Sequence, residues 1–314
     1  MSLLVSKMNI LVIGGGISPE REVSLRSSKA VENALNGLDH RSFLYDWDGS
    51  TDWLRSHGCS FDMIFPILHG EGGEDGYIQK ILEGLNIPFL GSDSTSSRNC
   101  MNKDVTRRSQ EANNIQIPRG DVVDFKEYKS HDLYNKPHVL KPVMGGSSID
   151  THIFNDATVK NIVPIEASFN KGSEYLIEEY IFGIEVTASI LGEEALPIAE
   201  IIPPPNEVFD FANKYNGKTR EICPPENISI SLQKDLQEKA LLVHNTMGCR
   251  HISRVDMIIN KKGIHVLEIN TMPGMTEESL FPRAARAYGK SLGDVAQIFV
   301  SLVNAQESTS VAYN

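Results

Sequence analysis

Apolar and polar positions in the first part of the chain alternate between short apolar runs and stretches with helical spacing. The runs predict strands at 9–13, 63–68 and 87–90, with helices at 24–35 and 77–85. Strand–helix alternation of this kind is typical of a parallel sheet with helices on both faces. Ligands of such sheets bind outside the carboxyl ends of the strands. The glycine-rich loops Gly14–Gly16 and His69–Gly76 follow two of these strands, so both are candidate binding elements.

The pattern changes after Gly91. The segment 92–102 is polar without clear periodicity, and 103–113 has helical spacing. From His138 onward the apolar runs are longer and favour antiparallel strands. These strands are predicted at 138–141, 175–180, 185–191, 195–202, 253–259 and 264–269, with helices at 232–247 and 291–303. The chain therefore combines a parallel α/β part with a part built on antiparallel sheets.

Composition narrows the class of protein. The chain has 314 residues, 40% hydrophobic and 23% charged, which suits two or three globular domains. No apolar run approaches the roughly 18 residues that span a bilayer, and no signal-peptide pattern is present at the N-terminus. The formal charge of −11 argues against nucleic acid as a partner, because phosphate backbones bind basic surfaces. The four cysteines are scattered, which favours reduced thiols. We expect a soluble cytoplasmic protein with no membrane partner.

Two nucleotide-binding motifs are incomplete. Gly14–Gly16 follows a strand, but the dinucleotide fingerprint needs a third small residue where Pro19 stands. Gly217-Lys218-Thr219 resembles the end of a P-loop, but Ala212 stands where the first glycine belongs. If the chain uses ATP, it does so through another architecture.

Two apolar-alternating strands flank Lys261-Lys262-Gly263 in the segment 253–279. A three-residue hairpin loop with a left-handed glycine in its last position fits this sequence and places Asn260 opposite Ile264. Side chains alternate between the two faces along a strand. Counting outward from the loop predicts the core-facing residues Val255, Met257, Leu267 and Ile269.

The other face of this hairpin gathers charge. Asp256 falls opposite Glu268 in this register. The next pair is Arg254 and Asn270. Facing carboxylates repel each other and need a compensating charge. Two acids and an amide oxygen suit Mg²⁺ with phosphate oxygens completing its shell, and Arg254 suits an anion or a developing oxyanion. A solvated face with Arg254 paired to an acid is the alternative, and the hairpin alone does not decide between them.

Two further loops offer backbone N–H groups for anions. Asn270–Thr276 turns sharply, and Ser279 stands at a predicted helix start. Lys141 ends an apolar strand and precedes Gly145–Ser148, whose small residues let the backbone approach a phosphate closely. An ordinary flexible turn has the same composition, so this loop is a weak signal by itself.

In their order along the chain, these segments resemble the D-alanine–D-alanine ligase family. The matching segments are 15–25, 69–76, Lys103, 141–142, 146–148, Glu178, Gly183, Glu185, 209–211, 214–215, 254–256, 267–276 and 279–280. The motif Leu267–Thr276 is long and highly specific. The resemblance implies an ATP-grasp enzyme with an N-terminal α/β domain at 8–100 and two ATP-grasp subdomains at 101–185 and 186–306.

The resemblance also implies the residues that carry each role. Those implied to contact ATP are Lys103, Lys141, Ser148, Glu178 at the adenine, Glu185 at the ribose, and Lys214. Those implied to hold two Mg²⁺ ions, with Mn²⁺ as an alternative ion, are Asp256, Glu268 and Asn270. Those implied to bind the two D-alanines are Glu20, His69, Lys214, Arg254, Ser279 and Leu280. Those implied to act in catalysis or loop closure are Glu20, Ser147, Tyr215, Arg254 and the backbone N–H of Gly274.

The implied reaction proceeds through an acyl phosphate. The carboxylate of the first D-alanine attacks the γ-phosphate of ATP, and the amine of the second attacks the resulting carbonyl. Arg254 and Gly274 would stabilise the oxyanion, while Glu20, Ser147 and Tyr215 would hold a loop closed against water, which hydrolyses acyl phosphates. The dipeptide would serve peptidoglycan precursor synthesis, and a homodimer is expected from the resemblance.

Three positions depart from the family pattern. Asp150 stands where the family usually has glycine, and an acid there is expected to repel phosphates unless the position is relaxed. Phe209–Phe211 replaces a tyrosine-rich segment, and Glu179 stands where some members have lysine. These departures keep two alternatives open. One is an ATP-grasp ligase with another amino acid or a hydroxy acid as acceptor, and Tyr215 argues for an amine acceptor over a hydroxy acid. The other is a weakly active nucleotide-binding paralogue.

Overall fold

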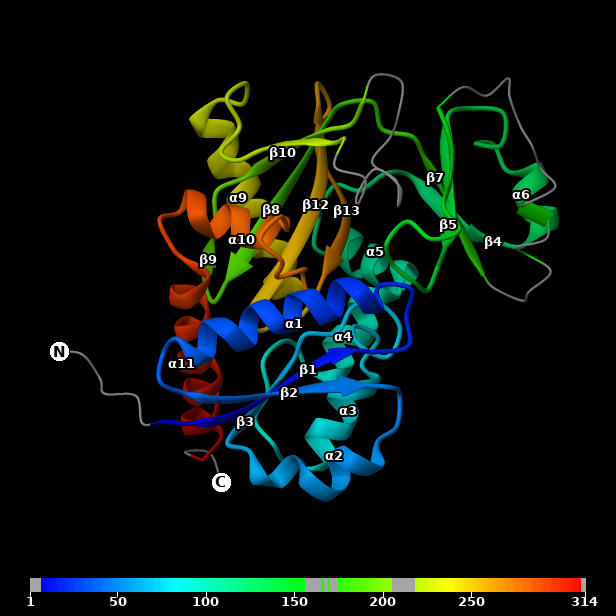
Figure 1. Ribbon diagram of the computed structural model, residues 1–314. Coiled ribbons are helices and arrows are strands. Elements are labelled where there is room, and N and C mark those ends of the chain that lie inside the picture. The colour runs from blue at the N-terminus through cyan, green and yellow to red at the C-terminus, as the bar shows by residue number, and fades with distance from the viewer. Residues whose placement is uncertain (1–6, 156–164, 167–168, 170–173, 205–217, 312–314) are drawn as a thin grey trace.

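The computed structural model describes residues 7–155, 165–166, 169, 174–204 and 218–311. Within these residues the chain forms three sheets (Figure 1). A parallel sheet holds the N-terminal strands, and two antiparallel sheets hold the later ones, as the sequence pattern predicted. No helix in this described part is long and apolar enough to cross a bilayer.

The parallel sheet has the strand order β2-β1-β3. Its strands are β1 (Asn9–Gly15), β2 (Arg41–Trp47) and β3 (Met63–Pro66), and its helices are α1 (Arg21–Asn36), α2 (Asp52–His57) and α3 (Tyr77–Gly84), with a 3₁₀ turn at Gly58–Ser60. Ile10 and Val12 of β1 enter one core, and Leu11 and Ile13 enter the core on the other face. This two-sided burial explains why β1 reads as a continuous apolar run.

The first of these cores includes the last helix of the chain. Helix α11 (Leu292–Val311) packs beside α1, and the ring of Phe299 lies 6.1 Å from that of Phe65 on β3. Figure 1 shows α11 running alongside the parallel sheet, although it is farthest from it in sequence. The predicted strand at 87–90 reduces to a single bridge between Phe89 and Ile64.

The polar segment 92–102 contains a helix that the pattern did not reveal. Helix α4 (Ser94–Met101) begins at Asp93, whose carboxylate accepts a hydrogen bond from the Ser96 backbone N–H at 2.8 Å. Its buried face consists of serines and Cys100, so it lacks the apolar stripe by which helices are recognised. Gly76 explains the close packing, because a Cβ there would lie 2.3 Å from the Ser94 carbonyl oxygen. The predicted helix that follows is α5 (Lys103–Ala112).

The four-stranded antiparallel sheet has the order β4-β7-β5-β6. Its elements are β4 (Gly120–Val123), α6 (Phe125–Ser130), β5 (His138–Pro142), β6 (His152–Phe154) and β7 (Tyr175–Glu179). Helix α6 begins with a capping box between Asp124 and Glu127. Its Tyr128 is fully buried, and the hydroxyl lies 3.0 Å from His138 Nε2, which satisfies both polar groups.

The six-stranded sheet has the order β11-β10-β8-β12-β13, with β9 beside β8. Its elements are β8 (Ile184–Leu191), β9 (Glu194–Ala195), β10 (Ala199–Ile202), β11 (Arg220–Ile222), α9 (Ile230–Thr246), β12 (Ile252–Asn260), β13 (Gly263–Asn270) and α10 (Leu280–Ala287). The single strand predicted at 195–202 is therefore wrong. Pro197 lies between β9 and β10, where it lacks the N–H that a continuous strand would need.

The hairpin of β12 and β13 confirms part of the predicted register and corrects the rest. Asp256 pairs with Glu268 and Arg254 with Asn270, as predicted. At the loop, however, Asn260 pairs with Gly263, one residue from the expected Ile264. A bulge between Asp256 and Met257 absorbs the difference.

The bulge changes which β13 side chains are buried. Val266, at 1% exposure, enters the core with Val255, Met257 and Ile269. Leu267 was predicted for that core, but it lines a cavity beside Glu268 instead. Two successive side chains of β13 therefore face the same cavity, which strict alternation does not allow.

This arrangement predicts that truncating the smaller side chain, Val266, destabilises the protein more than truncating the larger one, Leu267. Val266→Ala should lower the free energy of unfolding by about 2 kcal/mol, because it empties a closed core position. Leu267→Ala removes more carbon atoms, yet it should cost under about 1 kcal/mol, because the side chain borders open space. Urea unfolding midpoints of the two variants provide the measurement. A larger loss for Leu267→Ala would show that the strand has no bulge at this point.

Candidate active site

Two cavities meet beside β13. The first, of about 400 Å³, lies between the loops after β1 and β3 and the turn after β13. The second, of about 420 Å³, lies between the four-stranded and six-stranded sheets. Lys103, Gly145, Gly146 and Glu268 line both cavities. The loops at the carboxyl ends of the parallel strands thus line a cavity where the sequence predicted a binding site.

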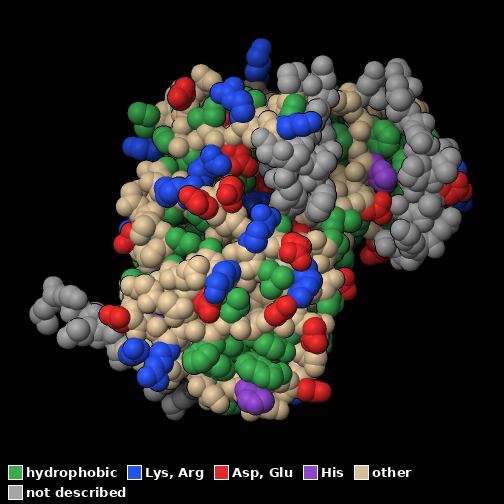
Figure 2. Space-filling model, in the orientation of Figure 1, with side chains coloured by type: hydrophobic (Ala, Val, Ile, Leu, Met, Phe, Trp, Pro, Cys, Tyr) green, Lys and Arg blue, Asp and Glu red, His purple; other side chains and the backbone are tan. Residues whose placement is uncertain are grey.

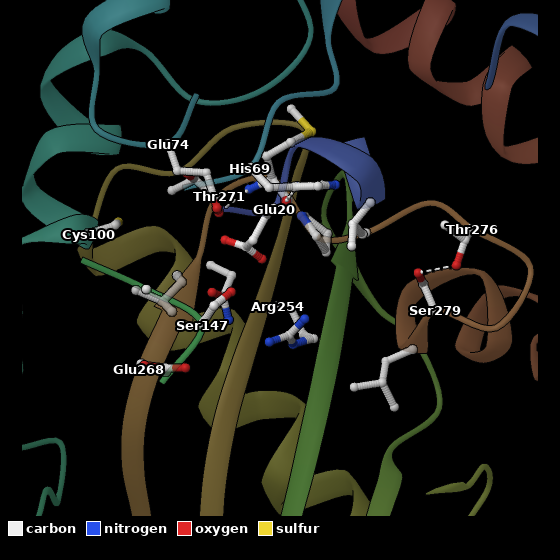
Figure 3. Close-up of a pocket in the computed structure, with 18 of the residues that line it drawn as sticks. Glu20, His69, Glu74, Cys100, Ser147, Arg254, Glu268, Thr271, Thr276 and Ser279 are labelled. Atoms are coloured by element: carbon white, nitrogen blue, oxygen red, sulfur yellow. Dashed lines mark hydrogen bonds between the residues drawn. The ribbon is translucent and has the colours of Figure 1, made fainter. Parts of the chain in front are cut away.

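The cavities contain every predicted site residue that the structure describes. Those lining the first are Glu20, His69, Lys103, Ser147, Arg254, Glu268, Asn270, Gly274, Ser279 and Leu280. Those lining the second are Lys103, Lys141, Ser148, Glu178, Glu185, Asp256 and Glu268. In Figure 3, Glu20, His69 and Glu74 lie on one side of the first cavity, across from Arg254 and Glu268. Lys214 and Tyr215 lie outside the described residues.

Arg254 and Asp256 form a forked ion pair on β12. Arg254 donates from Nε to Oδ1 at 2.9 Å and from Nη2 to Oδ2 at 2.8 Å. Thr187 and Asn270 donate to the same carboxylate, at 2.6 and 3.2 Å. Burial by itself would lower the pKa of Arg254, but the charge and hydrogen bonds of Asp256 raise it. The guanidinium therefore compensates the repulsion between Asp256 and Glu268.

The chemistry of this face also fits Mg²⁺. Asp256 and Glu268 are adjacent carboxylates, and Asn270 adds an amide oxygen, all hard donors. Among the described residues, no three His, Cys, Asp or Glu side chains converge as a complete metal cage. Mg²⁺ needs no such cage, because it usually binds one or two carboxylates together with phosphate oxygens. The donor set therefore fits a metal that arrives with a phosphate ligand.

A second cluster of charges lies in the cavity between the sheets. Lys141 Nζ lies 2.5 Å from Glu178 Oε1, and Arg107 Nη1 lies 3.6 Å from Glu178 Oε2. Glu178 and Lys141 are both buried, and a buried charge is stable only when it is paired. Arg107 was not predicted, because it lies on the polar helix α5 without any motif around it.

His69 connects the two halves of the first cavity. Its Nδ1 lies 3.0 Å from the Met272 carbonyl oxygen, and its Nε2 lies 3.4 Å from Ser27 Oγ. Burial lowers the pKa of His69, although the charge of Glu20 opposes this shift. The lowered pKa favours the neutral ring. A carbonyl only accepts, so Nδ1 carries the proton and Nε2 accepts from Ser27. The ring thus holds the loop after β3 against the turn after β13.

Comparisons with known proteins show which family the chain belongs to. Residues 120–301 match "D-ala D-ala ligase C-terminus", and residues 55–92 match "D-ala D-ala ligase N-terminus". The D-alanine–D-alanine ligase of Clostridium beijerinckii is 37% identical over 93% of this chain and 97% of its own length. The chain belongs to the D-alanine–D-alanine ligase family.

Solved structures of ligases agree with this assignment. The D-alanine–D-alanine ligase of Bacillus anthracis complexed with ATP superposes with a TM-score of 0.81 at 28% identity, covering 96% of this chain and 99% of that one. The VanG D-Ala:D-Ser ligase of Enterococcus faecalis gives a TM-score of 0.76 at 27% identity, covering 95% and 100%. The ATP-grasp architecture expected from the sequence is thereby confirmed.

Of the positions that depart from the ligase pattern, the structure describes Glu179 and Asp150. Phe209–Phe211 lies outside the described residues. Glu179 lines the second cavity, and its Oε1 accepts a hydrogen bond from the Arg119 backbone N–H at 3.3 Å. Asp150, expected to repel phosphates, has its carboxylate against Tyr175 and His152 instead.

Glu74 is a site residue that the sequence prediction missed. Its carboxylate accepts hydrogen bonds from the backbone N–H groups of Gly70 at 2.9 Å and Met272 at 3.2 Å. Burial and the nearby Glu20 carboxylate raise the pKa of Glu74 to about 8. The signal was present, because Glu74 lies in the glycine-rich loop His69–Gly76, which the sequence analysis named as a candidate binding element. The first cavity therefore has two acids, Glu20 and Glu74, on the side of the N-terminal sheet.

The raised pKa of Glu74 predicts a pH dependence of stability. In the unfolded chain this carboxyl ionises near 4.5, and in the folded chain at about 8. The folded state binds the proton more tightly, so its stability contribution is full below about pH 4.5 and is lost as the pH rises toward 8. Glu74→Gln replaces the titrating carboxyl group with a neutral amide. The unfolding free energy of this variant should therefore fall less than that of the wild type between about pH 5 and pH 7.5.

The measurement is urea unfolding of wild type and Glu74→Gln at both pH values. Each unit of pKa difference corresponds to about 1.4 kcal/mol. Glu71, an exposed acid of the same loop, provides the control, and Glu71→Gln should retain the wild-type pH dependence. Identical pH dependence in wild type and Glu74→Gln would contradict the shifted pKa.

Proposed function

We propose that this chain joins two D-alanines in an ATP-dependent reaction that yields D-alanyl-D-alanine, ADP and phosphate. The observation that carries the proposal is the meeting of two cavities at Lys103, Glu268 and the Gly145-Gly146 loop. One cavity suits a nucleotide and the other suits amino acids, so phosphoryl transfer can occur where they join. The family assignment supports the same reaction, with peptidoglycan precursor synthesis as its purpose.

The cavity between the sheets provides the groups that ATP requires. Lys103 and Lys141 supply positive charge for phosphates, and the small residues Gly146 and Ser148 let the backbone approach them. Glu185 on β8 offers acceptors for ribose hydroxyl groups, and Glu178 is assigned to the adenine end. The solved Bacillus anthracis ligase was described with ATP, which supports this use of the cavity.

The other cavity has the charge distribution of an amino-acid site. Glu20 and Glu74 lie on the side that would receive the first ammonium group, with His69 beside them. Helix α10 begins at this cavity, which Ser279 and Leu280 line, and a helix N-terminus suits the second carboxylate. The hydroxyls of Ser279 and Thr276 lie 2.8 Å apart, which fixes this end of the turn.

The chemistry then follows from the positions of the side chains. The first carboxylate attacks the γ-phosphate and ADP leaves; the second amine attacks the acyl carbon, and phosphate leaves. Mg²⁺, held by Asp256, Glu268 and Asn270, would neutralise phosphate charge when bound. Arg254 and the N–H of Gly274 stabilise the oxyanion. Lys214 and Tyr215 keep the roles that the family resemblance implies, with Ser147 and Glu20 closing the site.

Three wider properties belong to the same proposal. The domain division at 8–100, 101–185 and 186–306 is supported by the three sheets, which fall in successive parts of the chain. A cytoplasmic location is supported by the use of ATP and by the four cysteines, all of them free thiols. A homodimer is inferred from the family resemblance. Lysines, arginines and acids are interspersed on the face shown in Figure 2, which supports small molecules over nucleic acid as ligands.

Phosphate release tests the proposal and its alternatives. Purified protein with Mg²⁺ and ATP should release phosphate when D-alanine is added, and it should do so more slowly with D-serine, D-lactate as acceptor, or L-amino acids. Higher activity with another acceptor would favour a ligase of different specificity. ATP binding without phosphate release for any substrate would favour the nucleotide-binding paralogue.

Arg254 should act mainly on the chemical step. Charge develops on the carbonyl oxygen only when the amine attacks, so a donor at that position stabilises the transition state more than the ground state. Arg254→Ala should lower kcat by about 10²–10³. Nucleotide affinity should survive, because the phosphates are assigned to Lys103, Lys141 and Mg²⁺. Arg254→Lys should remain impaired, since lysine lacks the planar fork.

ATP affinity, from calorimetry, and kcat, from phosphate release, are measured on the same Arg254→Ala preparation. A hundredfold loss of ATP affinity with unchanged kcat at saturation would identify Arg254 as a phosphate ligand and refute the oxyanion role.

A further inference from the structure

The loop after β5 separates the two cavities of the site. Gly145 and Gly146 line both cavities, Ser147 lines the first, and Ser148, Ile149 and Thr151 line the second. The conformation of this loop therefore decides where Ser147 and Ser148 stand relative to both substrates. Of the described residues in this loop, Asp150 is the one that departs from the family pattern, and it lines neither cavity.

The backbone of the loop is strained. Ser147, Ser148 and Asp150 have φ values of 52°, 56° and 55°, in the left-handed region. This conformation costs a residue with a Cβ about 1 kcal/mol or more. The hydrogen bonds within the loop are long, at 3.2 Å for Ile149 N–H to the Gly146 oxygen and 3.3 Å for Thr151 N–H to the Ser148 oxygen. Contacts outside the loop must therefore supply part of the energy that keeps this shape.

Two such contacts lie at the ends of the loop. At the start, Lys103 Nζ donates to the Gly145 carbonyl oxygen at 2.6 Å. At the end, the Tyr175 hydroxyl donates a hydrogen bond to Asp150 Oδ2, and His152 Nε2 lies 3.1 Å from Oδ1. The first contact uses a residue assigned to ATP, whereas the second uses the four-stranded sheet.

Tyr175 is a rigid anchor. It lies on β7, is 1% exposed, and its ring packs 4.5 Å from that of Phe169 between centroids. A buried tyrosine hydroxyl needs a hydrogen-bond partner, and Asp150 provides one. His152 belongs to β6 of the same sheet, so Asp150 is held from two strands of that sheet, between which β5 lies. The carboxylate is directed to the sheet, and its charge is used in holding the loop.

We propose that Asp150 is a positioning residue of this enzyme, which fixes the strained loop to Tyr175 and His152 and so places Ser147 and Ser148 between the nucleotide and amino-acid cavities. The proposal rests on the proposed ligase function for its effect on catalysis. The contacts of Asp150 with Tyr175 and His152, called the tether below, exist in the free protein and can be measured there.

Three substitutions separate the tether from the backbone conformation. Asp150→Gly relieves the left-handed strain but removes the tether, so the KM for ATP should rise roughly tenfold with a smaller change in kcat. Tyr175→Phe keeps the buried ring and should reproduce this effect. Asp150→Asn tolerates the left-handed conformation and still accepts from Tyr175, so it should stay within about twofold of wild type. The double variant Asp150→Gly/Tyr175→Phe should be no worse than either single variant.

Amide hydrogen exchange of the nucleotide-free protein gives a readout that is independent of activity. Exchange in residues 144–151 should accelerate roughly tenfold in Asp150→Gly and Tyr175→Phe, and remain near wild type in Asp150→Asn. Wild-type exchange rates in Asp150→Gly, or faster exchange with an unchanged KM for ATP, would overturn the proposal. A lower KM in Asp150→Asn would show that the acid repels phosphate and would also overturn it. Failure of the wild type to release phosphate with D-alanine would instead refute the ligase function, and exchange would still test the tether.

Discussion

The forked ion pair between Arg254 and Asp256 is the interaction on which the site depends. Two carboxylates face each other on neighbouring strands, an arrangement that destabilises a sheet unless a cation compensates it. Arg254 supplies that charge from the same strand, with Thr187 and Asn270 completing the hydrogen bonds of Asp256. The two interpretations that the hairpin left open are therefore compatible. The structural ion pair holds the acids in the arrangement that the proposed Mg²⁺ site needs.

Other parts of the molecule form the cavities beside this hairpin. The parallel sheet presents its loops at the carboxyl ends of β1 and β3, and His69 and Glu74 fasten one of these loops to the turn after β13. The four-stranded sheet contributes one wall of the cavity between the sheets, which is the proposed nucleotide site. The core on one face of the parallel sheet also includes Leu191 of β8 and Ile252 of β12, so the site lies where packed layers meet. Such junctions are common places for ligand sites, because grooves remain where layers join.

Buried charges in this site are consistently used in pairs. Glu178 lies between Lys141 and Arg107, and Asp256 lies against Arg254. Glu74 has no such cationic partner among its hydrogen bonds, and its pKa rises accordingly. Outside the cavities, the half-buried carboxylate of Asp150 is held by the Tyr175 hydroxyl and by His152. Position relative to these partners decides what each acid does, and residue type alone does not.

The sequence by itself determined the features that depend on local periodicity and short motifs. Alternation along β12 and β13 placed Asp256 opposite Glu268, and the apolar runs located most strands within a few residues. The motif order identified the family and most lining residues. Tertiary structure decided the rest. The bulge turned Leu267 out of the core, because loop geometry and partner strands set local register. Helix α4 packs through small residues, Glu74 is shifted by burial, and Asp150 turns toward Tyr175 on another strand. These outcomes depend on contacts and desolvation between segments distant in sequence, which no local pattern records.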